Sequence, residues 1–246
     1  MKLAILLTIG LCIGCLVSTT AQSAKSAGIC RAGKTAPSIG SWTWAENSHV
    51  QVYVRIPDFA ETEVAYMLVA IQNWDASYLE NGSGVRFEYR GTVSEDKACA
   101  ACLTITLGDT SDRRHGAELR AFSRRGDQVI DHALIVIDPA YRKARTLTSI
   151  VAHEIGHSLG LLDCYSCNQG STAMGHFKST LKLFQLELTS LSKGIEGPTI
   201  CDRAEVKEAY RELSRVVRPS PQGITSLEPV EDGEEPEEDD TPTVVP

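Results

Sequence analysis

The stretch that decides the fold is HEIGHSLGLLD, which runs from His153 to Asp163. Two histidines four residues apart lie one turn above the other on the same side of a helix. One metal ion can therefore bind both imidazoles. This H-E-x-x-H pattern is typical of a zinc site in which the glutamate acts as the base for a water molecule activated by the metal. We predict His153 and His157 as metal ligands and Glu154 as the catalytic base.

The residues after the second histidine supply a third ligand. Gly160 lies where the helix has to stop, because glycine can adopt the left-handed conformation that ends a helix and turns the chain. Such a turn brings Asp163 back toward the metal and leaves a fourth position for water. We therefore predict Asp163 as the third ligand. The alternatives are His176, or a downstream glutamate such as Glu187 or Glu196 that would complete a thermolysin-like site.

The motif resembles that of the metzincin metallopeptidases, in which H-E-x-x-H-x-x-G-x-x-H is followed by a methionine turn. Most members have a third histidine where this chain has Asp163, and the snapalysin-like members carry aspartate there. The methionine turn is matched by Ser171 to Gly175, with Met174 as an apolar floor beneath the metal. The order of elements around the motif is also similar to that of the matrixins.

The resemblance implies an α+β zincin domain with a mixed twisted β-sheet, an active-site helix, a methionine turn and a C-terminal helix. It also implies Zn²⁺ as the metal and a protein or peptide substrate. The substrate would lie in extended form along an antiparallel edge strand, because strand addition needs only unpaired backbone groups.

Composition divides the 246-residue chain into four parts. Residues 1–24 combine a positive start, an apolar run and small residues, which is typical of a secretory signal and too short to favour a stable membrane span. Residues 25–48 are interpreted as a leader, residues 49–218 as the catalytic domain and residues 219–246 as an acidic, proline-rich disordered tail. We expect a secreted or periplasmic protein, with a lipid anchor at Cys15 as the alternative.

The net charge of −8 is concentrated at one end of the chain. Nine acidic residues and no basic ones follow Arg218. The remainder is close to neutral and has no basic patch of the kind that binds nucleic acid, so we expect no nucleic-acid partner.

Six cysteines remain after the signal, and an even number in an exported protein favours three disulfides. We predict the pairs Cys99–Cys102, Cys164–Cys167 and Cys30–Cys201. The last pair would tie the start of the domain to its final helix. Two C-x-x-C pairs also fit a structural zinc site, which is the alternative.

Hydrophobic periodicity predicts the elements around the motif. The expected strands cover residues 49–56, 85–89, 103–107, 117–123 and 134–137. A helix is expected over residues 60–78, and residues 176–197 fit either helix or loop. Thr146 or Thr148 would cap the active-site helix, and Thr199 or Asp202 would cap the final helix.

Together these features predict an exported zinc metalloendopeptidase. The alternative is an exported zinc-binding adhesion or interaction module that keeps the fold without turnover. The presence of Glu154 favours the enzyme, since a structural zinc site has no need of that carboxylate.

Overall fold

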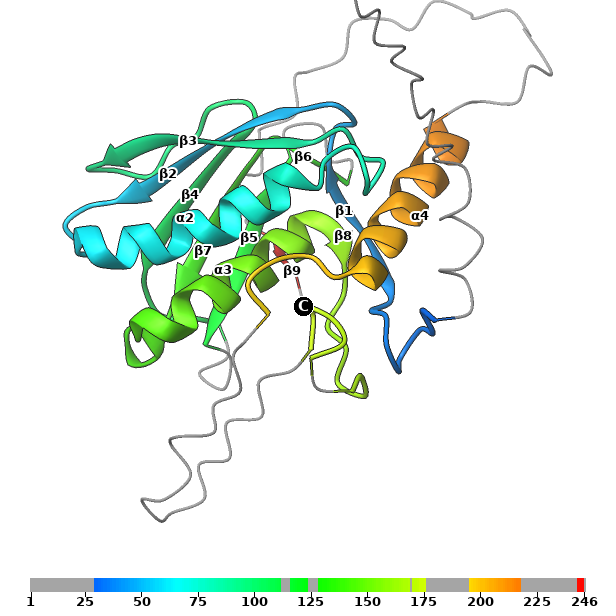
Figure 1. Cartoon of the computed structure of the whole chain (residues 1–246). Coiled ribbons are helices and arrows are strands. Elements are labelled where there is room, and N and C mark those ends of the chain that lie inside the picture. Colours follow the sequence, from blue (N-terminus) through cyan, green and yellow to red (C-terminus); the bar gives the residue numbers. More distant parts are fainter. Residues whose placement is uncertain are drawn as a thin grey trace, which may run out of the picture.

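The computed structural model describes residues 29–111, 116–123, 128–168, 170–175, 195–217 and 243–245. The predicted secretory signal, the first residues of the predicted leader and the segment 176–194 lie outside these ranges. Most of the predicted acidic tail also lies outside them. Figure 1 shows helices packed against a twisted sheet, which makes the fold α+β as the sequence predicts.

The main sheet has six strands in the spatial order β3-β2-β4-β7-β5-β9. The strands are β2 (His49–Arg55), β3 (Arg86–Val93), β4 (Cys102–Leu107), β5 (Ala117–Phe122), β7 (His132–Ile137) and β9 (Thr243–Val245). Strands β3, β2, β4 and β7 run parallel, whereas β5 is antiparallel to β7 and β9 is antiparallel to β5. The sheet is therefore mixed. Strand β5 covers the segment predicted as an edge strand, but β9 pairs with its outer side, so β5 lies inside the sheet and β9 forms the edge.

Two helices cover one face of this sheet, namely α2 (Glu61–Ala76) and α3 (Ala144–Ser158), as Figure 1 shows. The short helix η2 (Pro139–Tyr141) leads from β7 into α3. The indole Nε1 of Trp74 on α2 donates to the carbonyl of Ala152 on α3 at 2.8 Å. The apolar sides of the two helices and the sheet form one continuous core.

The start of α3 differs from the prediction. The helix begins at Ala144, one residue after Lys143, and no side chain caps it. The hydroxyl of Thr148 donates instead to the carbonyl of Tyr66 on α2, at 2.9 Å. Thr146 donates to the carbonyl of Lys143 at 2.8 Å. The cap prediction was wrong because the packing of α2 against α3 places Thr148 inside the helix, where its hydroxyl finds a partner across the helix interface.

A second, smaller sheet has the order β6-β1-β8, with strands β1 (Ile39–Trp44), β6 (Val129–Ile130) and β8 (Leu159–Leu161). Strand β1 lies in the predicted leader, where the sequence analysis expected no strand. Trp44 at its end is only 1% exposed, so this segment contributes to the core. Strand β8 follows α3 directly and carries the chain from the histidine pair toward Asp163.

The final helix α4 (Ile200–Val217) lies beside β1 and β8 (Figure 1). Its start is capped reciprocally. The N–H of Thr199 donates to Asp202 Oδ2 at 2.8 Å, and the N–H of Asp202 donates to Thr199 Oγ1 at 3.2 Å. Both predicted cap residues are therefore confirmed, and they act as a pair.

All three predicted disulfides are present, which are Cys30–Cys201, Cys99–Cys102 and Cys164–Cys167. The first joins the segment before β1 to the first turn of α4. The other two close short loops, each with a sequence separation of 3. The structure therefore favours disulfides over the alternative of a zinc site built from two C-x-x-C pairs.

The predicted disordered tail contributes one strand, β9, at the outer edge of the main sheet. The prediction rested on acidic and proline-rich composition, and it did not include this strand. The three residues of β9 are Thr-Val-Val, which are β-branched and favour extended backbone. A neighbouring edge strand supplies hydrogen bonds to such a segment through backbone groups alone.

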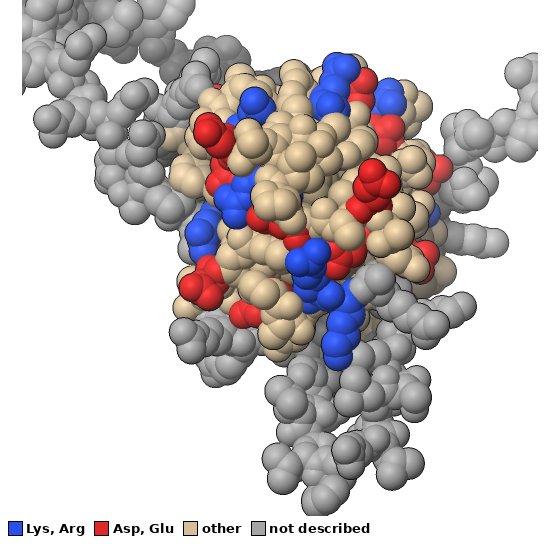
Figure 2. All heavy atoms as spheres, turned by 90° about the vertical axis from the view of Figure 1, so that its left-hand side faces the viewer, with Lys and Arg blue, Asp and Glu red and all other residues tan. Residues whose placement is uncertain are grey.

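Figure 2 shows basic and acidic side chains interspersed on one face of the molecule, with neither sign gathered into a patch there. Ion pairs such as Arg142 with Glu63, at 2.6 Å, join α2 to the segment before α3. Within the described ranges, no helix combines the length and the apolar character needed to cross a bilayer.

Candidate metal centre

The histidine pair lies on the buried side of α3. The Nε2 atoms of His153 and His157 are 3.1 Å apart, and both side chains are almost completely buried. Glu154 has a donor atom in the same group, in which all ligand atoms lie within 4.8 Å of one another. These three residues therefore form a group that could hold a metal ion.

Backbone carbonyls orient both imidazole rings. His153 Nδ1 lies 2.9 Å from the carbonyl oxygen of Ala173, and His157 Nδ1 lies 2.8 Å from that of Leu161. A carbonyl oxygen can only accept, so each Nδ1 carries the proton in these contacts. In the neutral rings the lone pair is then on Nε2, which faces the shared site. Metal-binding histidines are typically held in this way.

Asp163 reaches the same site. The helix ends at Ser158, and Gly160 has φ of +86°, which confirms the predicted turn. The turn places Asp163 Oδ1 at 2.9 Å from His153 Nε2 and at 3.7 Å from His157 Nε2. Two ligands at about 2.0–2.1 Å from zinc in tetrahedral geometry are about 3.3 Å apart. The three donor atoms have the mutual spacing that one tetrahedral ion requires.

The alternative third ligands are His176, Glu187 and Glu196, and the structure describes only the last of them. His176 and Glu187 lie outside the described residues. Glu196 is described, and its backbone carbonyl accepts a hydrogen bond from Asn73 on α2 at 2.9 Å. Among the described residues, the structure brings Asp163 together with the histidine pair and shows no such contact for Glu196.

Met174 packs against the helix that carries the histidines. Its side chain is fully buried. A Cβ atom added to Gly156 would lie 2.3 Å from Met174 Sδ, so the sulfur occupies the space that a larger residue on α3 would need. The carbonyl of Met174 also accepts from the N–H of Cys164 at 2.8 Å. Met174 thus lies between α3 and the chain that follows Asp163.

The predicted methionine turn is anchored by Asp202, whose side chain is completely buried. The hydroxyl of Thr172 donates to Asp202 Oδ1, and the N–H of Ala173 donates to Oδ2 at 2.9 Å. The carbonyl of the same Ala173 orients His153. Asp202 therefore connects the start of α4 to a histidine of the site. The sequence predicts Asp202 only as a helix cap, since nothing local to it indicates a partner thirty residues earlier.

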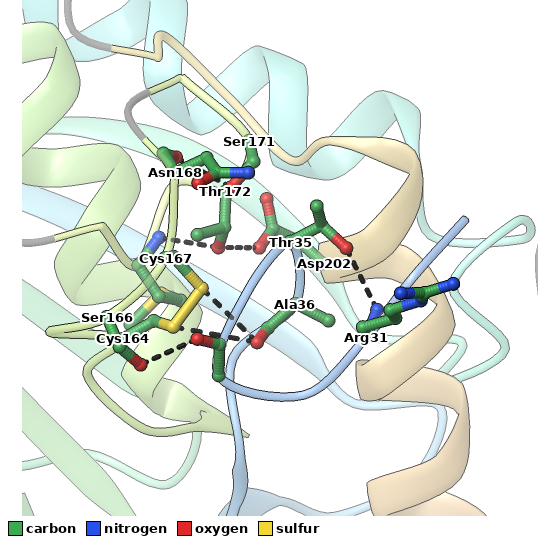
Figure 3. Close-up of a disulfide and its surroundings, with 12 residues drawn as sticks. Arg31, Thr35, Ala36, Cys164, Ser166, Cys167, Asn168, Ser171, Thr172 and Asp202 are labelled. Carbon is green, nitrogen blue, oxygen red and sulfur yellow. Dashed lines mark hydrogen bonds between the residues drawn. A yellow bond between two sulfur atoms is a disulfide. The ribbon is translucent and has the colours of Figure 1, made fainter. Parts of the chain in front are cut away.

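The chain after Asp163 is braced by the segment before β1, as Figure 3 shows. Ser166 Oγ donates to the carbonyl of Gly33 at 2.6 Å. The N–H of Asn168 donates to the carbonyl of Lys34 at 2.8 Å. The Cys164–Cys167 disulfide lies against the carbonyl of Ala36. The predicted leader thus supports the loop that carries the third candidate ligand.

Glu154 is a buried carboxyl group with an unusual pKa. Its side chain is on α3, and the residue is only 4% exposed. Burial raises the pKa to about 7. The charges of Asp163 and Glu118 act in the same direction, and they are opposed by His153 and by a hydrogen bond from the backbone of Leu119. Glu154 Oε2 has no hydrogen-bond partner among the described residues. A carboxyl group that titrates near neutrality is well matched to proton transfer.

His153 and Asp163 carry opposite charges that stabilise each other. Burial alone would lower the pKa of His153, but the hydrogen bond that the protonated ring donates to Asp163 and the charge of Glu154 outweigh it and raise that pKa to about 9. Burial raises the pKa of Asp163, but its contacts with the two histidines hold it well below the ordinary value. Two carboxylates facing two imidazoles therefore favour a positive charge in this site, supplied either by a proton or by a cation.

The sequence matches no protein-family model, and no curated protein matches it. Among solved structures, the chain is similar to metalloproteinase-II from Bacteroides fragilis, with 13% sequence identity and a TM-score of 0.33. The similar region covers 63% of this chain and 57% of that chain. The chain therefore spans less than two thirds of that protein's length, and at this level of similarity its function is inferred from the geometry of its own site.

Proposed function

We propose that this protein is an exported zinc-dependent endopeptidase. The observation that carries the proposal is the convergence of His153 Nε2, His157 Nε2 and Asp163 Oδ1 on one point beside the buried carboxylate of Glu154. Nitrogen and oxygen donors in this number and spacing suit zinc with one open position. When bound, zinc would act as a Lewis acid that acidifies water and polarises a peptide carbonyl.

Glu154 is the proton carrier in this proposal. As a carboxylate with a pKa of about 7, it accepts a proton from the attacking water and then passes that proton to the leaving amine. The N–H of Leu119 on β5 donates to the carboxylate and helps to hold it in place. His153, His157 and Asp163 hold the metal, while Ala173 and Leu161 fix the two rings.

The substrate is a protein or peptide in extended form. Glu154 is hydrogen-bonded to the backbone of Leu119, so the base lies beside the antiparallel strand β5. An extended peptide can pair with an edge strand through backbone groups alone, which places its peptide bonds beside that strand. Export is supported by the three disulfides, since such bonds persist in oxidising compartments.

The test compares the zinc-loaded wild type with Glu154→Gln on a diverse library of peptides. Glutamine keeps the size of the side chain but cannot accept the proton, so cleavage should fall by at least about 100-fold while one zinc per chain is retained. Asp163→Ala should lose zinc as well as activity. Glu208→Gln, at a partly exposed position of α4 where the carboxylate pairs with Arg211, is the control and should behave as the wild type.

Two results would overturn the proposal. One is a zinc-loaded wild type that cleaves no peptide faster than Glu154→Gln does, which would favour the zinc-binding module without turnover. The other is full zinc content and full activity in Asp163→Ala, which would remove Asp163 from the ligand set.

A further inference from the structure

Strand β9 occupies a position next to the proposed active site. It pairs antiparallel with β5, in the register Leu119 with Val245, Arg120 with Val244 and Ala121 with Thr243. Leu119 is also the residue whose backbone hydrogen-bonds to Glu154. One residue of β5 is therefore a neighbour of both the candidate catalytic base and Val245. In Figure 1, β9 (red) lies at the β5 edge of the main sheet.

An extended peptide substrate would need the same backbone groups. The inner side of β5 is already paired with β7 along its whole length. The outer side is the only side of β5 that remains for an added strand, and β9 is on it. Two strands cannot pair with one edge at the same time, so a peptide and β9 must exclude each other.

We infer that Thr243–Val245 is a resident occupant of the β5 edge, which an extended peptide has to displace before cleavage. The inference rests on the proposed function for its effect on catalysis, whereas the docking of β9 does not depend on it. The acidic tail then acts as a tethered competitor, and the sheet edge beside the metal centre is the surface on which substrate and tail compete.

The length of the tether and the size of the strand agree with this role. Residues 218–242 separate α4 from β9, and 25 residues can span up to about 80 Å, which exceeds the diameter of a domain of this size. Only three residues pair with β5, so the contact is small enough for a substrate to displace.

The first experiment measures docking without turnover. In the Glu154→Gln background, hydrogen exchange of the segment that contains β5 is compared between the full chain and the variant Val244→Pro. Proline lacks an N–H and is poorly tolerated in a paired strand, so β5 should exchange several-fold faster in the variant. Val230→Pro makes the same substitution in the tail outside β9 and is the matched control. Unchanged exchange in Val244→Pro would overturn the inference.

The second experiment measures competition. A chain that ends at Arg218, and the full chain with Val244→Pro, should both show a KM for peptide substrates that is several-fold lower than that of the wild type, with similar kcat. A free peptide of residues 241–246 should restore the higher KM of the shortened chain, and the same peptide with Val244→Pro should not. An equal KM in all these proteins would overturn the competition. If no protein cleaves peptides, the proposed function fails, and the exchange experiment still decides whether β9 docks.

Discussion

At the scale of single residues, the position of Asp163 depends on its second oxygen. Oδ1 faces the histidines, whereas Oδ2 accepts a hydrogen bond from the hydroxyl of Tyr165 at 2.9 Å. A hydrogen bond to the distal oxygen of a ligating carboxylate fixes its rotation, and partners of this kind typically change metal affinity by about 10–100-fold. Tyr165 is thus a candidate positioning residue that the sequence motif does not include.

We predict that Tyr165→Phe lowers zinc affinity about tenfold, because the phenyl ring keeps its place but cannot donate to Asp163. Competition with a chromogenic chelator would measure the change. Tyr165 is 60% exposed, so the free energy of unfolding should change by less than about 0.5 kcal/mol. The control is Tyr66→Phe, because Tyr66 is also an exposed tyrosine but lies on α2. Equal zinc affinity in wild type and Tyr165→Phe would show that Oδ2 needs no donor.

Glu154 leads to a prediction about pH for the metal-free protein. Its pKa is raised from 4.5 to about 7 by burial, so keeping it ionised in the folded state costs free energy. The cost is absent below pH 4.5, grows as the pH rises and is complete above about pH 7. Glu154→Gln should therefore stabilise the metal-free protein at pH 8 by about 1–3 kcal/mol and leave it nearly unchanged at pH 4.5.

Chemical denaturation of both proteins with a chelator present, at pH 4.5 and pH 8, measures this difference. Comparing the two proteins at each pH removes the contribution of all other titrating groups that the substitution leaves alone. A stability difference that is the same at both pH values would contradict the assignment of a raised pKa to Glu154.

At the scale of elements, α4 and the methionine turn depend on each other through Asp202. The carboxylate accepts from Thr172, from the N–H of Ala173 and from the N–H of Thr199. Asp202→Asn would place an NH₂ group against donors, and leaving buried donors without an acceptor costs about 1–3 kcal/mol each. We predict a loss of about 2–4 kcal/mol in the free energy of unfolding.

The same substitution should weaken zinc binding, because Ala173 both donates to Asp202 and orients His153 through its carbonyl. Denaturation of the metal-free protein and a separate zinc titration would measure the two effects. Glu208→Gln on the same helix removes a charge from the surface and should change stability by no more than about 0.5 kcal/mol. Equal stability of wild type and Asp202→Asn would contradict the prediction.

The elements that the sequence predicted well are those with a local signal. Alternating valines predicted β2, and the helical turn between His153 and His157 together with Gly160 predicted how α3 ends. Other features depend on tertiary contacts. Strand β1 is a strand because it pairs with β6 and β8, which its own residues do not indicate. The role of Thr148 depends on the packing of α2, and the anchor at Asp202 depends on a residue thirty positions away.

At the scale of the whole molecule, the two ends of the main folded segment are joined by one covalent bond. Cys30–Cys201 has a sequence separation of 171, so it closes a loop that contains the smaller sheet, every strand of the main sheet except β9, both α2 and α3, and the candidate metal centre. In the chain-entropy model, a crosslink stabilises a protein by limiting the unfolded chain, and the effect grows with the length of the loop. Cys99–Cys102, with a separation of 3, limits the unfolded chain far less.

We therefore predict that replacing Cys30 and Cys201 with serine lowers the free energy of unfolding by about 5 kcal/mol, against about 2 kcal/mol for the same change at Cys99 and Cys102. The pairs are well matched, since each joins one buried cysteine to a more exposed one. Denaturation of the oxidised proteins would measure both losses. Because Cys201 lies next to Asp202, the first variant should also lose zinc at a lower denaturant concentration. Equal losses for the two pairs would show that loop closure does not dominate, and that local contacts around each sulfur decide the stability instead.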